Sequence, residues 1–519
     1  MGSMPDPQKV AEHEVKLGAD ATFVLPDLVA SPAGDASPTV TDLGERTLSA
    51  TYWDTSDLRL TRSGLSLRHR TASDGSEKGW TVKLPAPGDG GPALRRSEVA
   101  FSGADRSPPA AAAALVAATT RGRRLEMVAR LVTTRRRHHI LDARGRVALE
   151  VADDAVTVLD GRRVVDGFRE LEVELAPGDH DGAALLPLVV ARLQDAGAGA
   201  ADPTPKIARA LGARAAAPPD VEVGSVGSKA SAGAAVQAAI AAGTRRLVAH
   251  DPGVRLGGDD EDVHQARVAT RRLRSDLATF RPLLDRAWVA AIRSELQWLG
   301  GELGAARDAD VLLERLERQA GALGGPDGVA AAALLHTLAA ERTTARARAG
   351  AALGTPRYAA LLDQLVGASQ LPPVTEAAAE RATKVLPGQV AKAWRTLARV
   401  VEEAGDEPTV EQLHEVRKKA KRCRYACEAA APVCGKKAKV LGAAIAGLQE
   451  VLGDLQDATV AEHWLRSRTV GGTGPDAASH AFSAGLLTAV QQREAEKAIG
   501  TWRATWTAAS AKKLRTWLA

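Results

Sequence analysis

Acidic and basic residues recur at alternate positions in the first part of the chain. A β-strand places residues two apart on the same face, so each such group would present its charges together. The groups are Glu12 and Glu14 with Lys16, Arg68 with Arg70, Arg135 with Arg137, and Glu170 with Glu172 and Glu174, while Lys83 and Glu98 stand singly in strand-like segments. For one pair alone, the simplest interpretation is the solvated outer face of an antiparallel sheet.

The full set of charges favours a closed barrel over an open sheet. Like charges on neighbouring strands of an open sheet repel each other, whereas a barrel that encloses a multivalent anion and cations needs such groups inside. A linear triphosphate requires several Arg and Lys side chains around its oxygens. Carboxylates suit Mg²⁺ or Mn²⁺, and the candidate ligands are Glu12, Glu14, Glu172 and Glu174, with either Asp153 or Asp154 in addition.

Two sets of basic residues occur at helical spacing in the second part of the chain. His264, Arg267, Arg271 and Arg274 fall on one side of a helix, and His414, Arg417, Lys421 and Arg424 repeat the same offsets. For a single copy, the simplest interpretation of such a basic stripe is a solvated helix face. Like charges along one side repel each other, so two matched stripes favour a basic channel or saddle for an extended polyanion. The two histidines are either buried structural residues or titrating phosphate ligands.

The elements that must carry these residues change in type near residue 211. Two-residue alternation with Gly, Pro and Asp between the runs predicts mostly β structure up to that point, with short helices near residues 110–119 and 184–196. A Pro/Gly/Ser-rich stretch follows, and a 3.6-residue apolar period then predicts helices to the end. The predicted domains are residues 5–213 and 229–519, with a linker at 214–228.

An internal repeat divides the helical domain. Residues 263–274 reappear as 413–424, and residues 303–309 reappear as 452–458. The sequence therefore predicts two similar helical bundles, at about 229–370 and 374–519. Within the second repeated segment, Asp308 and Asp457 are expected to begin helices.

The composition is that of an ordinary globular chain. Its 519 residues are 45% apolar and 25% charged, with a net charge of +5. Aromatic residues are only 3% of the chain, which argues against stacking platforms for single-stranded nucleic acid, so a nucleic-acid partner is not expected. Only three cysteines occur, which indicates a reducing compartment. No apolar run is long enough to span a membrane, so no membrane partner is expected.

Residues 10–211 resemble a CYTH domain, a member of the triphosphate tunnel metalloenzymes. Glu12-His13-Glu14-Val15-Lys16 matches the family's Glu-x-Glu-x-Lys signature, and residues 51–60, 64–70 and 205–211 are similar too. The resemblance implies an eight-stranded antiparallel tunnel, with Glu12, Glu14 and Lys16 at its catalytic centre. It implies a triphosphate bound by Lys16, Arg68, Arg70, Lys83, Arg135, Arg137 and Lys206, and Mg²⁺ or Mn²⁺ bound by Glu12, Glu14, Glu172 and Glu174, to which we add Asp153.

The helical domain resembles a CHAD domain, the conserved-histidine α-helical domain that is often fused to CYTH domains. The match rests on residues 263–274 and 413–424, and on the segments around Arg307-Asp308 and Gln456-Asp457. It implies two four-helix bundles with pseudo-twofold symmetry that bind inorganic polyphosphate. We expect the two basic stripes to provide that surface.

The sequence thus predicts an α+β multidomain protein with an antiparallel β tunnel followed by an all-α lobe. The predicted function is metal-dependent hydrolysis of a triphosphate in the tunnel, combined with polyphosphate binding by the helices. The alternative is a non-catalytic polyphosphate-binding protein. An adenylate cyclase would need adenine recognition that the sequence does not locate, and a nucleic-acid binder is the weakest alternative. We expect a cytoplasmic location, and association with polyphosphate granules remains open.

Overall fold

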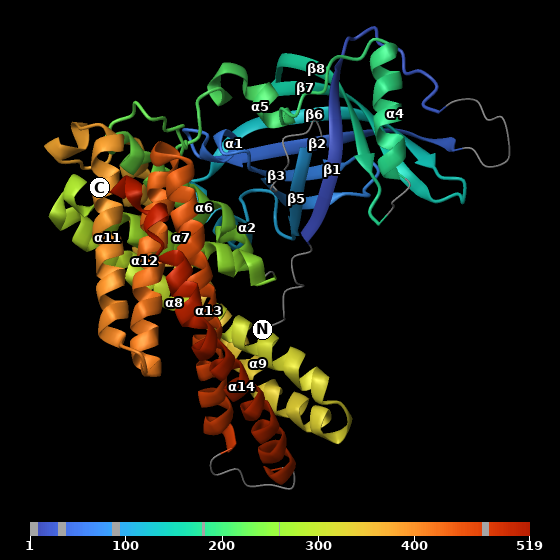
Figure 1. Cartoon of the computed structure of the whole chain (residues 1–519). Coiled ribbons are helices and arrows are strands. Elements are labelled where there is room, and N and C mark those ends of the chain that lie inside the picture. Colours follow the sequence, from blue (N-terminus) through green and yellow to red (C-terminus); the bar gives the residue numbers. More distant parts are fainter. Residues whose placement is uncertain are drawn as a thin grey trace. The chain divides into compact units, whose positions relative to one another are not determined.

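The computed structural model describes residues 9–29, 38–85, 94–178, 182–258, 260–469 and 477–518, with only the backbone described at 9–12, 94–95 and 469. Contacts divide the chain into two units, Met1–Asp220 and Val221–Ala519 (Figure 1). The division falls within residues 214–228. The first unit is built on β-strands and the second consists of helices, which confirms the predicted fold class.

Eight antiparallel strands close into a barrel in the first unit, in the order β1-β5-β4-β3-β2-β6-β7-β8. The strands are β1 (Lys9–Ala19), β2 (Thr39–Asp54), β3 (Ser66–Ala72), β4 (Lys78–Pro85), β5 (Leu94–Phe101), β6 (Glu126–Leu141), β7 (Val147–Asp160) and β8 (Arg163–Leu175). A barrel of this size encloses either packed side chains or one small ligand.

Part of the barrel wall carries apolar side chains on its outer face and charges on its inner face. On β1, Val15 and Leu17 are buried in the outer cluster, while Glu14 and Lys16 line a cavity inside. Helix α4 (Gly182–Asp195) covers the outer face with Leu186, Val189 and Leu193. Both faces of β1 are covered. Its side chains therefore alternate between apolar and charged, and not between buried and solvent-exposed as in a sheet with one open face.

Helix α5 (Lys206–Leu211) is anchored in the barrel by apolar residues. Ile207 and Leu211 pack into one hydrophobic cluster with Ala50, Tyr52 and Leu131. This anchoring brings the first residue of α5, Lys206, to the charged cavity. The shorter helices α1 (Arg59–Arg62), α2 (Ala110–Leu115) and α3 (Ala117–Thr120) complete the unit, and α2, α3 and α4 occur where the sequence predicts helices.

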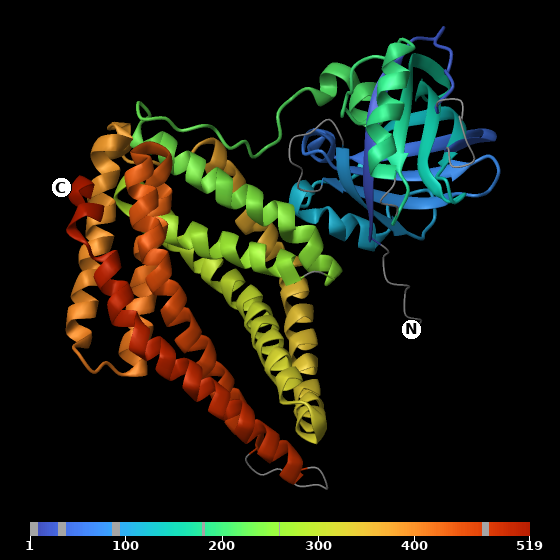
Figure 2. The ribbon, with the colours of Figure 1, turned by 45° about the vertical axis from the view of Figure 1, so that its right-hand side comes forward.

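The second unit repeats one arrangement of four helices. The first set is α6 (Ala232–Leu256), α7 (Asp260–Thr279), α8 (Arg286–Leu323) and α9 (Gly325–Leu353), and the second is α11 (Ala382–Ala404), α12 (Val410–Cys434), α13 (Lys436–Thr469) and α14 (Ala477–Ala509). Successive helices pack together in each set, and α7 packs against α12. Figure 2 shows the long helices running side by side in pairs. Among the described residues, no helix has the length and hydropathy needed to cross a membrane.

Two details of the helical unit differ from the expectation. A further helix, α10 (Pro356–Gln370), packs against α6 and α8, so the described part of the first half has five α-helices rather than four. Asp308 and Asp457 lie inside α8 and α13 and do not begin helices. Helix α8 continues through this region because Leu299, Leu303 and Ala306 bury one face, so the glycines of the repeat do not interrupt it.

Candidate functional site

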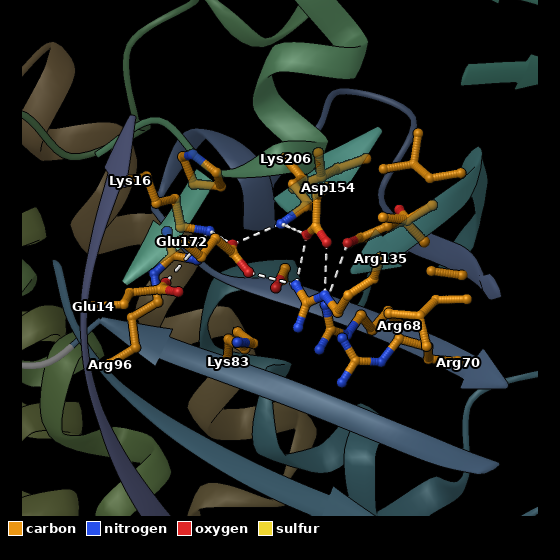
Figure 3. Close-up of a pocket in the computed structure, with 18 of the residues that line it drawn as sticks. Glu14, Lys16, Arg68, Arg70, Lys83, Arg96, Arg135, Asp154, Glu172 and Lys206 are labelled. Atoms are coloured by element: carbon orange, nitrogen blue, oxygen red, sulfur yellow. Dashed lines mark hydrogen bonds and ion pairs between the residues drawn. The ribbon is translucent and has the colours of Figure 1, made fainter. Parts of the chain in front are cut away.

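The inner face of the barrel forms a charged cavity, with about 90 Å³ of space open to the centres of water-sized molecules (Figure 3). Seven basic side chains line it, namely Lys16, Arg68, Arg70, Lys83, Arg96, Arg135 and Lys206, together with the acidic side chains Glu14, Asp154, Glu172 and Glu174. Burying charges is unfavourable unless they are paired or bind a ligand. The excess of positive charge along the wall suits a polyanion.

The strand register brings these side chains together. On β1 and β8, Glu14 lies opposite Glu174 and Lys16 lies opposite Glu172. On β6 and β7, Arg135 lies opposite Asp154, and Arg135 donates to that carboxylate from Nε at 2.7 Å and from Nη2 at 2.6 Å. Acids and bases far apart in the sequence therefore meet inside the barrel.

Three buried carboxylates, Asp154, Glu170 and Glu172, form a carboxylate triad around the Lys206 ammonium. Their oxygens lie within 4.8 Å of one another. Lys206 Nζ lies 2.8 Å from Asp154, 2.7 Å from Glu170 and 2.6 Å from Glu172. Lys16 Nζ and Arg135 Nη2 each approach Glu172 to 2.5 Å. Burial alone would raise the pKa of Glu172, but Lys16, Lys206 and Arg135 outweigh it and hold that pKa well below its usual range.

Glu14 and Glu174 form a second acidic cluster with less compensation. Glu14 is 4% exposed, and its Oε1 accepts no hydrogen bond, although Lys16 Nζ lies 3.4 Å from it. Burial and the nearby charges of Glu14 and Glu172 raise the pKa of Glu174 to about 7. A divalent cation would relieve this repulsion. Because Mg²⁺ and Mn²⁺ prefer carboxylate oxygens, this cluster and the carboxylate triad fit such an ion by their donor atoms.

Among the cavity arginines, Arg70 shows the opposite imbalance, whereas neighbouring groups outweigh burial and raise the pKa of Arg68 and of Arg135. Arg68 is 7% exposed, with Nη2 3.5 Å from Glu98 and Nη1 3.5 Å from the Tyr52 hydroxyl. The Arg68 Nε has no hydrogen-bond partner. Burial and the charge of Arg68 lower the pKa of Arg70, although Arg70 pairs with Glu77. An anion in the cavity would stabilise these guanidinium groups.

Most predicted tunnel residues line the cavity: Glu14, Lys16, Arg68, Arg70, Lys83, Arg135, Glu172, Glu174 and Lys206. The assignment of Asp153 as a metal ligand is corrected. Its carboxylate pairs with Arg169 at 2.7 and 2.9 Å, while Asp154 lines the cavity. Neighbouring residues of a strand point to opposite faces, so only one of the two can face inward. Arg137 lies 3.7 Å from Glu150 and is not among the lining residues. The backbone of Glu12 pairs with Arg96, and its side chain lies outside the described residues.

Sequence reasoning missed Arg96 and Tyr52 of the lining, and assigned no role to Glu170. Arg96 has the same two-residue spacing from Glu98 that marks the other pairs. Tyr52 carries no charge, so nothing in the charge pattern marks it. Its position opposite Arg68 on β2 and β3 appears only in the fold.

The two basic stripes meet where α7 packs against α12. Four residues, Arg267, Arg271, Arg417 and Lys421, form what we call the central basic cluster. Burial, followed by the charges of Arg417 and Arg271, lowers the pKa of Lys421 to about 7. Arg417 Nη2 is 4.0 Å from Asp457, and Arg271 Nε donates to the Tyr425 hydroxyl at 2.6 Å. Positive charge therefore exceeds its local compensation at this surface.

The remaining stripe residues contact neighbouring polar groups. Arg274 donates to Gln297 at 3.3 Å, Arg424 donates to Glu428 at 2.8 Å, and the His414 ring is hydrogen-bonded to Gln456. Burial and the charge of Arg307 lower the pKa of His264. All eight stripe residues are partly buried, so neither stripe is a fully solvated helix face.

Repeated glycines make room for the arginines of the central basic cluster. A Cβ atom added at Gly304 of α8 would lie 3.1 Å from Nη2 of Arg267, and one added at Gly453 of α13 would lie 3.6 Å from Nη2 of Arg417. Each guanidinium group thus lies against the neighbouring helix where a side chain is missing. This contact explains why a glycine follows leucine at the same place in both repeats.

A closed barrel with a charged interior, joined to a duplicated helical unit, defines a two-domain class of protein. The chain belongs to the family that combines a CYTH domain, matched at residues 14–186, with a CHAD domain, matched at residues 238–466. CYTH domains are metal-dependent and include triphosphatases and cyclases. CYTH and CHAD domains are associated with triphosphate and polyphosphate.

Similar proteins include one from Mycobacterium tuberculosis strain H37Rv, described as uncharacterized. It is 32% identical over 529 residues, which cover 95% of this chain and 94% of that protein. Among solved structures, PptA from Streptomyces chartreusis is 25% identical with a TM-score of 0.46, over 54% of this chain and 100% of its own. The CHAD domain from the plant Ricinus communis is 26% identical with a TM-score of 0.44, over 56% of this chain and 97% of its own.

Proposed function

We propose that the barrel hydrolyses a linear triphosphate with Mg²⁺ or Mn²⁺, and that the helical unit binds inorganic polyphosphate. The observation that carries the first part is the enclosure of seven basic side chains and several carboxylates in one cavity (Figure 3). A purely structural interior would pair these charges with one another. Here the acidic and basic sides each retain groups that a metal-bound polyanion would stabilise.

The basic side chains would bind and orient the phosphate chain. Arg68, Arg70 and Arg135 offer planar donor pairs to phosphate oxygens, and Lys83 and Arg96 extend the same lining. Transfer of a terminal phosphoryl group to water depends mainly on positioning and charge neutralisation. Glu14, Glu174 and the carboxylate triad would hold Mg²⁺ or Mn²⁺, which supplies charge stabilisation and a more acidic bound water.

Phosphate release from tripolyphosphate with Mn²⁺ tests the hydrolase assignment. Asp154→Asn is expected to lower the rate by about 100-fold, as loss of one preorganised electrostatic group does. Asp153→Asn is the matched control, since it changes the neighbouring residue on the outer face, and its rate is expected to equal that of the wild type. Glu14→Gln is a second inner-face variant with the same expectation as Asp154→Asn.

Two results would contradict the assignment. Equal rates for Asp153→Asn and Asp154→Asn would remove the cavity from the reaction. Absence of phosphate release from tripolyphosphate, thiamine triphosphate and ATP would favour the alternative of a non-catalytic phosphate-binding protein.

The central basic cluster supports the second part of the proposal. Arg267 and Arg417 occupy equivalent positions in the repeat, and both lie near Lys421 and Arg271. An extended chain of phosphates would contact both halves and release counterions, so its affinity should fall with salt.

Charge reversal tests this surface. The double variant Arg267→Glu/Arg417→Glu is expected to weaken binding of long-chain polyphosphate by at least about 100-fold, because each lost charged contact contributes about 1.5 kcal/mol. The control Arg318→Glu/Arg399→Glu changes the net charge equally at exposed positions of α8 and α11. Equal losses in the two variants would mean that net charge, and not this surface, determines binding.

A further inference from the structure

The position of Lys206 raises a question that the proposed function leaves open. Its ammonium contacts all three members of the carboxylate triad at 2.6–2.8 Å. The same three carboxylates offer oxygens close enough together to hold one metal ion. A lysine and a divalent cation would therefore use the same oxygens.

The charges around the triad make joint occupancy unfavourable. Lys16, Arg135 and Lys206 already contact the three carboxylates. Arg209 also lies 3.7 Å from Glu170, and Lys16 lies 3.4 Å from Glu14, so four cations already balance four carboxylates. Adding a divalent ion beside all of these cations would leave two uncompensated positive charges at a triad whose carboxylates are at most 11% exposed. Charge repulsion at such short distances in a buried site is strong.

We propose that Lys206 and a divalent cation compete for the carboxylate triad, so that the ion binds there only as the Lys206 ammonium leaves. This inference rests on the proposed metal-dependent function and adds a specific role for α5. Lysine suits it, because its flexible stem can move the charge while the backbone stays in place.

The anchoring of α5 determines where the displaced ammonium goes. Ile207 and Leu211 hold the helix in the apolar cluster with Tyr52 and Leu131. Lys206 therefore stays at the cavity wall, within reach of a bound phosphate chain. The lysine would exchange carboxylate partners for phosphate oxygens, and the positive charge lost from the triad would be replaced by the metal ion.

Mn²⁺ binding to the full chain, followed by electron paramagnetic resonance without any substrate, tests this competition. Lys206→Met keeps the length of the side chain and removes the charge, and it is expected to bind Mn²⁺ at least tenfold more tightly than the wild type. Adding Asp154→Asn removes one carboxylate of the triad and should reverse the gain. The control Lys78→Met removes an exposed lysine of the barrel and should bind Mn²⁺ as the wild type does.

An identical Mn²⁺ isotherm for the wild type and Lys206→Met would overturn the proposal. Reductive methylation of the unmodified chain supplies an independent test in case the variant does not fold. Mg²⁺ should increase methylation of Lys206 several-fold and leave Lys78 unchanged. Unchanged or decreased labelling of Lys206 would equally contradict the competition.

The outcomes separate this inference from the proposed function. Phosphate release by a wild-type chain whose Mn²⁺ isotherm does not respond to Lys206→Met would retain the function and reject the competition. A tenfold gain in Mn²⁺ affinity without phosphate release from any triphosphate would retain the competition and reject the hydrolase.

Discussion

Individual residues in both candidate sites are held in surroundings that oppose their usual charge. The pKa of Glu174 rises to about 7 through burial and the neighbouring glutamates, and the pKa of Lys421 falls to about 7 through burial and the neighbouring arginines. Such shifts concentrate at functional sites, because a ligand of opposite charge supplies the missing compensation. Glu174 would gain it from a cation and Lys421 from an anion.

Polyphosphate affinity should fall as the pH rises above about 7. Lys421 faces Arg417, Arg271 and Arg267, with Asp457 and Asp308 as nearby acids. Polyphosphate favours the charged ammonium, so above its pKa the lysine must take up a proton on binding, at a cost of up to tenfold in affinity per pH unit. Titrations between pH 7 and 9 measure this slope.

Lys421→Arg is the control for this pH dependence, because arginine stays charged over the whole range. Its affinity should change less steeply between pH 7 and 9 than that of the wild type. Equal slopes for both chains would assign the pH dependence to other groups.

Charge spacing in the sequence indicates which residues share a face, but it does not decide which face is the inner one. The alternation of Glu170, Glu172 and Glu174 is visible directly, whereas the choice between Asp153 and Asp154 needs the register of β7 against β6. Arg137 has the same parity as Arg135 but pairs with Glu150, and neither Arg137 nor Glu150 is among the residues that line the cavity. Position along a strand is set by barrel closure, which local spacing does not encode.

At the scale of elements, helix-to-helix contacts place the arginines of the central basic cluster. Helix α7 presents Arg267 to α8 at Gly304, and α12 presents Arg417 to α13 at Gly453. Glycine inside a helix costs up to about 1 kcal/mol relative to alanine. The repeated glycines offset this cost by letting each guanidinium group lie against the neighbouring helix.

Gly304→Leu should weaken polyphosphate binding roughly tenfold, because the new side chain displaces Arg267 and one charged contact contributes about 1.5 kcal/mol. Gly301→Leu on the same helix has open space at its Cβ and should bind like the wild type. Gly304 is buried and Gly301 is exposed, so Leu at 304 costs packing stability that Leu at 301 does not, and thermal unfolding must show that both variants are folded at the temperature of the binding assay. Equal affinities would show that the position of Arg267 does not matter.

The 3.6-residue apolar period predicts helices through the second unit, and Leu273, Leu277 and Phe280, which follow that period, are all in the core. It does not predict α10, whose packing against α6 and α8 is a tertiary contact. It also misplaces Asp308, because an apolar face continues through the glycines of α8. Local pattern thus identifies most elements, while their ends depend on the helices packed beside them.

For the whole molecule, alternation and the repeat predict a β part followed by a duplicated helical part, and the family resemblance predicts the closed barrel. Closure brings Lys206 of α5 to Glu172 of β8, a contact between segments that no spacing rule connects. The sequence therefore predicts which charged residues each site contains better than it predicts which of these side chains pair with one another. The pairing depends on long-range register and on the anchoring of α5.

The most direct test of the two-site account measures phosphate release from tripolyphosphate and binding of long-chain polyphosphate in the same full-length variants. Asp154→Asn should lose release and keep binding, while Arg267→Glu/Arg417→Glu should lose binding and keep release. Loss of both properties in each variant, with folding intact, would contradict the assignment of hydrolysis to the barrel and polyphosphate binding to the helices.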